Sequence, residues 1–178
     1  LIEKVARKSA SIHSYRSACD DLGIKLVNVL WVLSSKTSTD HAELILGNSS
    51  KRFSGVTSTM LQTAIFQKEL IHMVIMGRHF VPAGFNVKSY KETAKLCRKP
   101  LSNSRWRVFH ARRNNEMLQA VSLKFLFGAK IKIVFTSTAQ RYPSWITRWL
   151  IRHTDGLITT SNIAAKYLPR KPDAIIPH

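Results

Sequence analysis

Short apolar segments alternate with stretches of helical periodicity from Glu43 onward, and this alternation limits the folds open to the chain. The runs AELILGN (42–48), HMVIMG (72–77) and KIKIVFT (130–136) are typical of buried strands. Between them, apolar residues recur at helical spacing. Such alternation predicts an α/β fold, with a Rossmann-like, mainly parallel sheet and helices on both of its faces.

The individual elements follow from the same patterns. We expect strands at 42–48, 72–77, 107–111, 130–136, 157–160 and 173–177, and helices at 56–65, 114–127, 144–153 and from residue 161. Residues 78–104 read as basic and irregular, with one short helix near 89–97. Asn114 or Asn115 is expected to cap its helix and Gly128 to close it. Met117, Leu118, Val121 and Phe125 should form one apolar stripe.

Residues 1–42 do not show the alternation of strands and helices seen in the rest of the chain. We therefore treat them as an N-terminal extension of unclear role and 43–178 as the domain. The run LVNVLWVL (26–33) is too short to span a bilayer, and no A-x-A cleavage site follows it. We therefore predict neither a signal peptide nor a membrane span there. Only two cysteines are present, Cys19 and Cys97, which favours a reducing, cytoplasmic compartment.

The chain is strongly basic, with 28 Lys and Arg against 10 Asp and Glu and a formal charge of +18. This excess indicates an anionic partner: nucleic acid, an anionic membrane surface or a phosphorylated substrate. A solvated basic surface without a single target is the alternative.

Polar residues gather where three predicted strands end. Ligands of parallel sheets bind beyond the carboxyl ends of the strands. There the chain carries SGVT (54–57), HARRN (110–114) and FTSTAQR (135–141). Backbone N–H groups at 54–55 can attract an anion, arginines suit phosphate or carboxylate, and hydroxyls suit polyols. Each motif also has an ordinary explanation as a turn, a surface arginine pair or a cap.

The segment SWITRWLIRH (144–153) places Trp145, Ile146, Trp149 and Leu150 along a helix beside Arg148 and Arg152. Two interpretations are open. The stripe can pack into the core with a solvated basic flank, or it can lie on a membrane surface, where Trp and Arg are favoured.

Complete catalytic motifs are missing from the sequence. We find no carboxylate pair of the glycosidase type, no convincing Ser-His-Asp order and no metal-binding spacing. We therefore assign no catalytic residue and expect no metal or cofactor.

Taken together, KRFSGVTST, RVFHARRNNEML, KIVFTSTAQR, WITRWLIRHTDGLITTS and AIIPH resemble the lipopolysaccharide core mannosyltransferases of Gram-negative bacteria, which are retaining glycosyltransferases of the two-domain GT-B fold. The resemblance runs from about Glu43 to His178. It implies the N-terminal domain of a GT-B fold, a sugar-nucleotide donor such as GDP-mannose, and an anionic lipid A–core acceptor.

The resemblance also assigns residues. A donor-facing loop would comprise Ser54, Gly55, Val56 and Thr57. The acceptor site would comprise His110, Arg112, Arg113, Asn114, Thr136, Ser137, Gln140 and Arg141. A catalytic His cannot be carried over, because Thr136 stands after the fourth strand where many related enzymes have one.

The sequence stops at IIPH, where the family continues into its donor-binding domain. The expectation is thus an acceptor-side half, inactive alone, cytoplasmic and able to lie peripherally on the inner membrane. The alternative is a basic, non-enzymatic nucleic-acid-binding module, although no known nucleic-acid motif is present.

Overall fold

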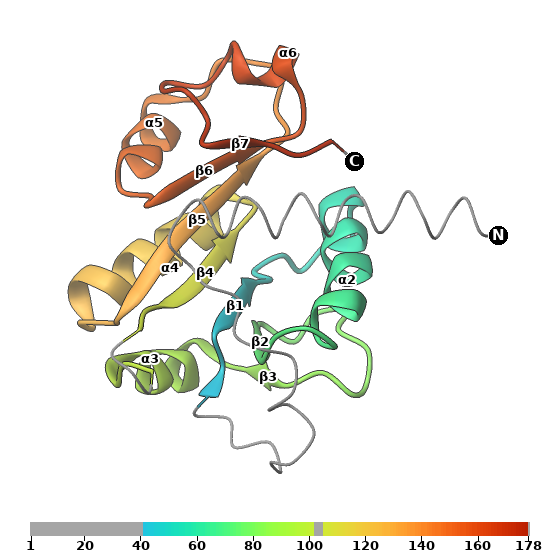
Figure 1. Ribbon diagram of the computed structural model, residues 1–178, viewed down its shortest axis with the longest axis vertical. Helices are drawn as coiled ribbons and strands as arrows, with labels where there is room; N and C mark the ends of the chain where they lie inside the picture. Colours follow the sequence, from blue (N-terminus) through green and yellow to red (C-terminus); the bar gives the residue numbers. More distant parts are fainter. Residues whose placement is uncertain (1–40, 102–104, 178) are drawn as a thin grey trace, which may run out of the picture.

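The protein, seen in a computed structural model, is described for residues 41–101 and 105–177; most of the expected extension, with Cys19 and the run 26–33, lies outside this part. Seven parallel strands form one sheet in the order β3-β2-β1-β4-β5-β6-β7 (Figure 1). The strands are β1 Leu44–Gly47, β2 Met73–Met76, β3 Val87–Lys88, β4 Arg107–Ala111, β5 Ile131–Ser137, β6 Gly156–Thr159 and β7 Ala174–Ile175. The predicted Rossmann-like α/β fold is confirmed.

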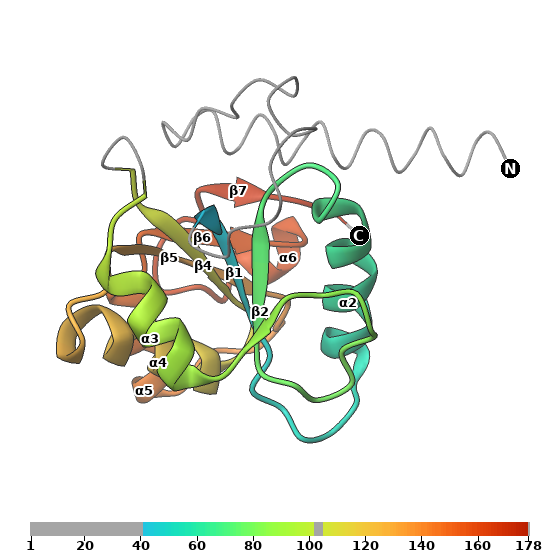
Figure 2. The ribbon, with the colours of Figure 1, turned by 90° about the horizontal axis from the view of Figure 1, so that it is seen from below.

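Helices cover both faces of the sheet, as predicted (Figure 2). The helices are α2 Gly55–Gln67, α3 Tyr90–Arg98, α4 Asn114–Leu126, α5 Trp145–Arg152 and α6 Asn162–Ala165. Successive strand residues point to opposite faces. Leu44 and Leu46 therefore meet Met60 of α2, whereas Ile45 joins the core under α3, α4 and α5.

The sheet order places one crossing point at the centre of the molecule. The chain winds outward from β1 through β2 to β3, then returns to pair β4 with the other side of β1. In sheets of this kind the crevice at such a reversal is where ligands bind. Here the reversal lies between the carboxyl ends of β1 and β4.

Local signals explain where the helices begin and end. Ser144 caps α5, its hydroxyl accepting from the Thr147 N–H at 3.3 Å, and Ser89 and Glu92 form a capping box on α3. Gly128 follows α4 with a φ of 62°, a conformation that favours glycine, so its predicted role in closing the helix is confirmed.

Several local predictions were wrong. Residues 78–104 contain the edge strand β3 besides the short helix. Helix α4 starts directly after Arg113, which holds the cap position in place of either asparagine. Leu118 and Phe125 are exposed, although their stripe partners Met117 and Val121 are buried. On α5, Trp145, Ile146 and Trp149 are exposed, so Leu150 is the only member of the expected stripe that packs inward, beside Ile151.

Among the described residues, the core holds one free thiol. Cys97 is buried, and burial raises its pKa to about 11 against the opposing effect of Arg107. The thiol is therefore protonated and unreactive near neutral pH. Within the described residues, no helix is long and apolar enough to cross a membrane.

Candidate functional site

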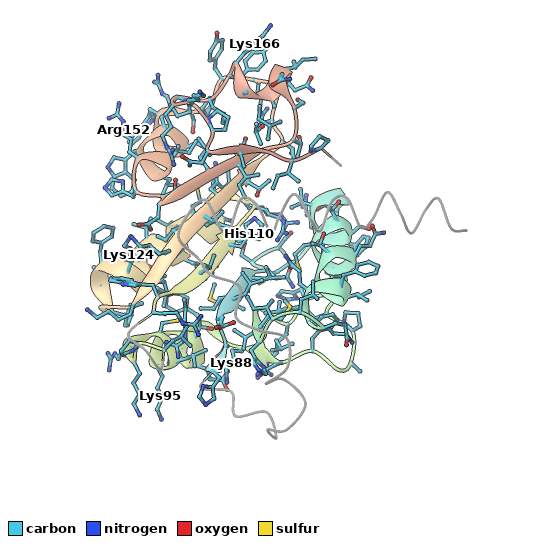
Figure 3. The ribbon with its side chains drawn as sticks, in the orientation of Figure 1. Lys88, Lys95, His110, Lys124, Arg152 and Lys166 are labelled. Carbon is cyan, nitrogen blue, oxygen red and sulfur yellow. The ribbon has the colours of Figure 1, made fainter. Side chains whose placement is uncertain are left out.

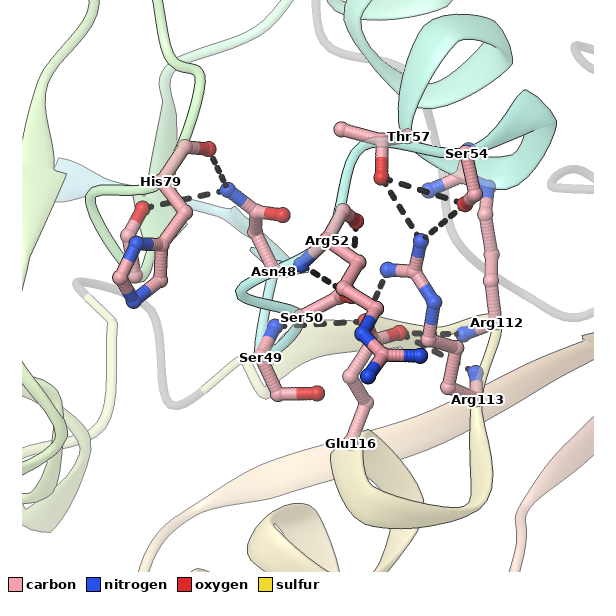
Figure 4. A network of polar contacts seen from close by, with 11 residues as sticks. Asn48, Ser49, Ser50, Arg52, Ser54, Thr57, His79, Arg112, Arg113 and Glu116 are labelled. Carbon is pink, nitrogen blue, oxygen red and sulfur yellow. Dashed lines mark hydrogen bonds and ion pairs between the residues drawn. The ribbon is translucent and has the colours of Figure 1, made fainter.

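A buried carboxylate organises the carboxyl edge of the sheet where β1 and β4 end. Glu116, in the first turn of α4, is fully buried. Figure 4 shows its polar contacts with the neighbouring loops. Its oxygens accept from the backbone N–H groups of Arg112 at 2.8 Å, Arg113 at 3.1 Å and Ser49 at 3.4 Å. Glu116 thereby satisfies the free N–H groups at the start of α4 and fixes the loop after β1 to it.

The guanidinium of Arg113 extends this network to α2. Its Nη1 donates to Glu116 at 3.0 Å, and its Nη2 donates to the hydroxyls of Ser54 at 2.8 Å and Thr57 at 2.7 Å. The mostly buried Arg113 guanidinium thus donates to three acceptors within the protein. Arg113 connects the loop after β4 to the start of α2, which makes it a positioning residue of this edge.

Two glycines, Gly47 and Gly77, let these loops approach each other closely. A Cβ on Gly47 would lie 3.0 Å from the Cβ and Cγ of Glu116, so a glycine makes room for the carboxylate. After β2, Gly77 has a φ of 116°, and a Cβ there would lie 2.1 Å from the backbone oxygen of Asn48. The buried Asn48 side chain donates to the carbonyl of His79 at 2.7 Å. The loops after β1, β2 and β4 are therefore held together.

His110 lies inside the sheet. It is buried in β4, and its Nε2 lies 2.7 Å from the hydroxyl of Thr136 in β5. Burial, and next the nearby Arg112, lower the pKa of His110 well below 6.5. The imidazole is therefore neutral at physiological pH and bridges two strands.

A pocket opens beside this network, beyond the ends of β4 and β5. Its volume is about 450 Å³. Four predicted acceptor residues line it: Arg112, Asn114, Ser137 and Arg141. Asn114 is held by a hydrogen bond from its Nδ2 to the Thr147 hydroxyl at 2.8 Å. The remaining lining residues are Phe135, Thr138, Ala139, Tyr142, Pro143, Ser144, Thr147, Ile151 and Leu168.

The lining decides what chemistry the pocket can support. Two guanidinium groups, an amide and several hydroxyls suit a polyhydroxylated ligand that carries an anionic group. None of the residues that line the pocket is an aspartate, glutamate or histidine. Among the described residues, no cluster of three or more His, Cys, Asp and Glu side chains could hold a metal ion. The pocket is equipped to bind and orient a ligand.

The remaining predicted residues lie elsewhere at the same edge. Ser54 and Thr57 face Arg113, and Gly55 starts α2 exposed while Val56 is half-buried. Thr136 pairs with His110, and Gln140 is exposed outside the pocket lining. The three strand-end motifs thus divide into a closed network and an open pocket.

Sequence reasoning missed residues in both parts. Glu116 was overlooked, although a glutamate in the third position of a helix, three residues after its cap, is a known start signal. For Ser144 and Thr147, the local pattern indicated the start of a helix and nothing more. Tyr142 carried no signal, because an exposed tyrosine beside a proline is ordinary in a loop.

Comparison with known proteins then tests the resemblance. No family model matches the chain. The lipopolysaccharide core biosynthesis mannosyltransferase LpcC of Rhizobium leguminosarum bv. viciae is 38% identical over 137 residues, which cover 76% of this chain and 38% of that protein. LpsB of Rhizobium meliloti (strain 1021), with the same description, is 37% identical over 136 residues and similarly covered. The chain thus spans about two fifths of the length of the curated relatives it matches.

Proposed function

We propose, because this chain is homologous to part of the lipopolysaccharide core mannosyltransferases, that it is the acceptor-side half of a glycosyltransferase. The pocket beyond β4 and β5 would hold an anionic inner-core sugar of lipid A–core. The sugar donor, GDP-mannose, would be bound chiefly by a second domain in a GT-B arrangement. The protein would act in the cytoplasm.

The observation that carries this proposal is the pocket itself. Arg112 and Arg141 line the same cavity, together with Asn114 and several hydroxyls. A guanidinium group can form two parallel hydrogen bonds to a phosphate or carboxylate, and hydroxyls and amides can read sugar hydroxyls. Arg113, which the resemblance also assigned to the acceptor, would act indirectly by holding the loops that frame the pocket.

The division of labour follows from the side chains. The pocket lining holds no carboxylate or imidazole that could transfer a proton. In this proposal the chain therefore binds and orients the acceptor hydroxyl, while activation of the donor comes from groups outside the described residues. The chain alone should bind acceptor and transfer no sugar.

Calorimetric titration of the chain with deacylated lipid A–core oligosaccharide tests this proposal. We expect saturable binding that Arg141→Ala and Arg112→Ala each weaken about tenfold, the loss of one charge-assisted contact. Arg98→Ala is the matched control, because Arg98 is exposed at the far end of α3, away from the pocket. Equal binding by all four proteins would overturn the assignment.

Three further measurements separate the alternatives. Incubation with GDP-mannose and acceptor should give no transfer by the chain alone, and the intact mass of the protein from its own cells tells whether a second domain accompanies it. A titration with duplex DNA tests the nucleic-acid-binding alternative suggested by the charge of +18. Tight, steeply salt-dependent DNA binding without any response to the oligosaccharide would favour that alternative.

A further inference from the structure

The pocket beyond β4 and β5 has an aromatic side chain in its wall. Tyr142 lines the pocket and, at 79%, is more exposed than any other Phe, Tyr or Trp among the described residues. Its ring therefore contributes little to the packing of the fold. We ask what it can contribute to the binding of a ligand.

The chain around Tyr142 holds this ring in place. Pro143 follows it, and a residue before proline is restricted to extended backbone. Ser144 then caps α5 by accepting from the Thr147 N–H at 3.3 Å, which ties the loop to the helix. The ring itself meets that of Tyr167, with the ring centres 5.2 Å apart and the ring planes at 71°. Both the backbone and the ring of Tyr142 are thus positioned before a ligand binds.

The geometry of the ring pair leaves Tyr142 able to stack. In an edge-to-face pair one ring directs its edge at a face of the other, so Tyr167 leaves at least one face of Tyr142 uncovered. The face of an aromatic ring carries partial negative charge and attracts the slightly positive hydrogens of C–H groups. Tyr142 therefore offers a stacking surface at the pocket.

The stacking surface and the polar groups reach the pocket from opposite sides of β5. Arg112 follows β4, whereas Leu168, next to Tyr167 in the chain, lies in the connection between β6 and β7. Strand β5 lies between β4 and β6 in the sheet. Figure 3 shows this separation, with His110 of β4 near the centre of the molecule and Lys166, which precedes Tyr167, at its β6–β7 end. A ligand in the pocket thus meets a guanidinium group on one side and an aromatic ring on the other.

A pyranose ring is suited to both sides. Its hydroxyls project around the rim, and the C–H groups of its faces are apolar enough to stack. An open-chain polyol has no such face. A nucleobase also stacks, but it offers few hydroxyls to the amide and hydroxyl groups that line the pocket. We propose that Tyr142 determines specificity by stacking on a pyranose that carries an anionic group; this role rests on the proposed function, which places an anionic sugar in the pocket.

Proton NMR titration of the chain with two matched ligands tests this role. Methyl glucuronide is a pyranose with a carboxylate, and gluconate is an open-chain polyol with the same charge. The parent should bind methyl glucuronide about tenfold more tightly than gluconate, and saturation of the protein's aromatic protons should transfer mainly to one face of the sugar. Tyr142→Ala should remove the preference, whereas Tyr142→Phe, which keeps the ring, should bind within about twofold of the parent. Because Tyr142 is exposed, Tyr142→Ala should keep the unfolding midpoint of the parent.

Trp106→Ala is the matched control. Trp106 is also exposed, but it precedes β4 at the amino edge of the sheet, so this variant should bind both ligands like the parent. Equal affinity of the parent for the two ligands, or an undiminished preference in Tyr142→Ala, would overturn the stacking role. So would binding of guanosine monophosphate that requires Tyr142 while methyl glucuronide does not bind.

Titration with the core oligosaccharide separates this role from the proposed function. Weaker binding by Arg141→Ala together with unchanged binding by Tyr142→Ala would overturn the stacking role and leave the acceptor assignment in place. If the parent binds methyl glucuronide through Tyr142 but does not bind the oligosaccharide, the acceptor assignment is overturned and the stacking role is supported.

Discussion

The loops that follow β4 and β5 carry similar residues in opposite environments. After β4, Arg113 is mostly buried and donates to Glu116, Ser54 and Thr57. After β5, Arg141 is exposed at the pocket. An arginine at a strand end can thus stabilise the fold or bind a ligand. Arg113 stabilises the fold because neighbouring residues accept its hydrogen bonds, whereas Arg141 is exposed to a ligand in the pocket.

The largest effect is expected at the centre of the closed network. Glu116→Ala removes the acceptor of three backbone N–H groups and leaves Arg113 without its buried counter-charge. The free energy of unfolding should fall by about 3–5 kcal/mol in urea titration. Glu69→Ala is the control, because Glu69 is exposed and its ion pair with Lys68 is a long surface contact of 3.9 Å. A loss below about 1 kcal/mol would show that the network contributes little.

The two arginines should differ in the same assay. Arg113→Ala should lower the free energy of unfolding by about 2 kcal/mol, because it leaves Glu116 and two hydroxyls without their donor. Arg141→Ala should change it by less than about 0.5 kcal/mol, since the side chain is exposed. Equal losses of stability in the two variants would remove the distinction between the closed network and the open pocket.

The buried histidine of β4 should make stability depend on pH. The pKa of His110 is lowered on folding, so below pH 6.5 the unfolded chain binds a proton that the folded protein excludes. The free energy of unfolding should therefore fall as pH drops from about 7 toward about 5, with up to about 1.4 kcal/mol per pH unit from this residue. His110→Gln should flatten that slope and leave the pH dependence above neutrality unchanged. An identical slope in both proteins would argue against a neutral His110.

A small loss of stability is expected at the contact between α4 and α5. Asn114→Ala removes the hydrogen bond to Thr147 that joins α4 to α5 beside the pocket. Because Asn114 is exposed, we expect a stability loss of about 1 kcal/mol or less by thermal unfolding. Binding of the core oligosaccharide should weaken as well, since Asn114 also lines the pocket. A change in stability without any change in binding would assign Asn114 to the fold alone.

Much of the fold follows from the pattern of apolar residues along the chain. The apolar runs around β1, β2 and β5 are continuous because both faces of a parallel sheet are covered, and such runs stand out from helical spacing. The edge strand β3 was missed, since it has only two residues and pairs with β2 alone in the sheet. The three strand-end motifs were found because the direction of parallel strands brings their carboxyl ends to one edge.

The sequence pattern did not predict which side of helix α5 faces the core. Its spacing indicated one stripe with Trp145, Trp149 and Leu150, yet only Leu150 faces the core. An eight-residue helix with apolar residues on several sides can pack in more than one rotation. Leu150 and Ile151 pack into the core that the strands and α4 share, and this packing is not visible in the spacing of α5.

Local periodicity and motifs are properties of the sequence, and they were enough for the α/β class, the positions of most elements and the resemblance to core mannosyltransferases. The roles of single side chains emerged only in three dimensions: Arg113 and His110 serve the fold, Arg112 and Arg141 share a pocket, and the tryptophans of α5 face outward. Those roles depend on which acceptors and apolar groups other strands and helices bring within reach, and residues far apart in the chain supply them.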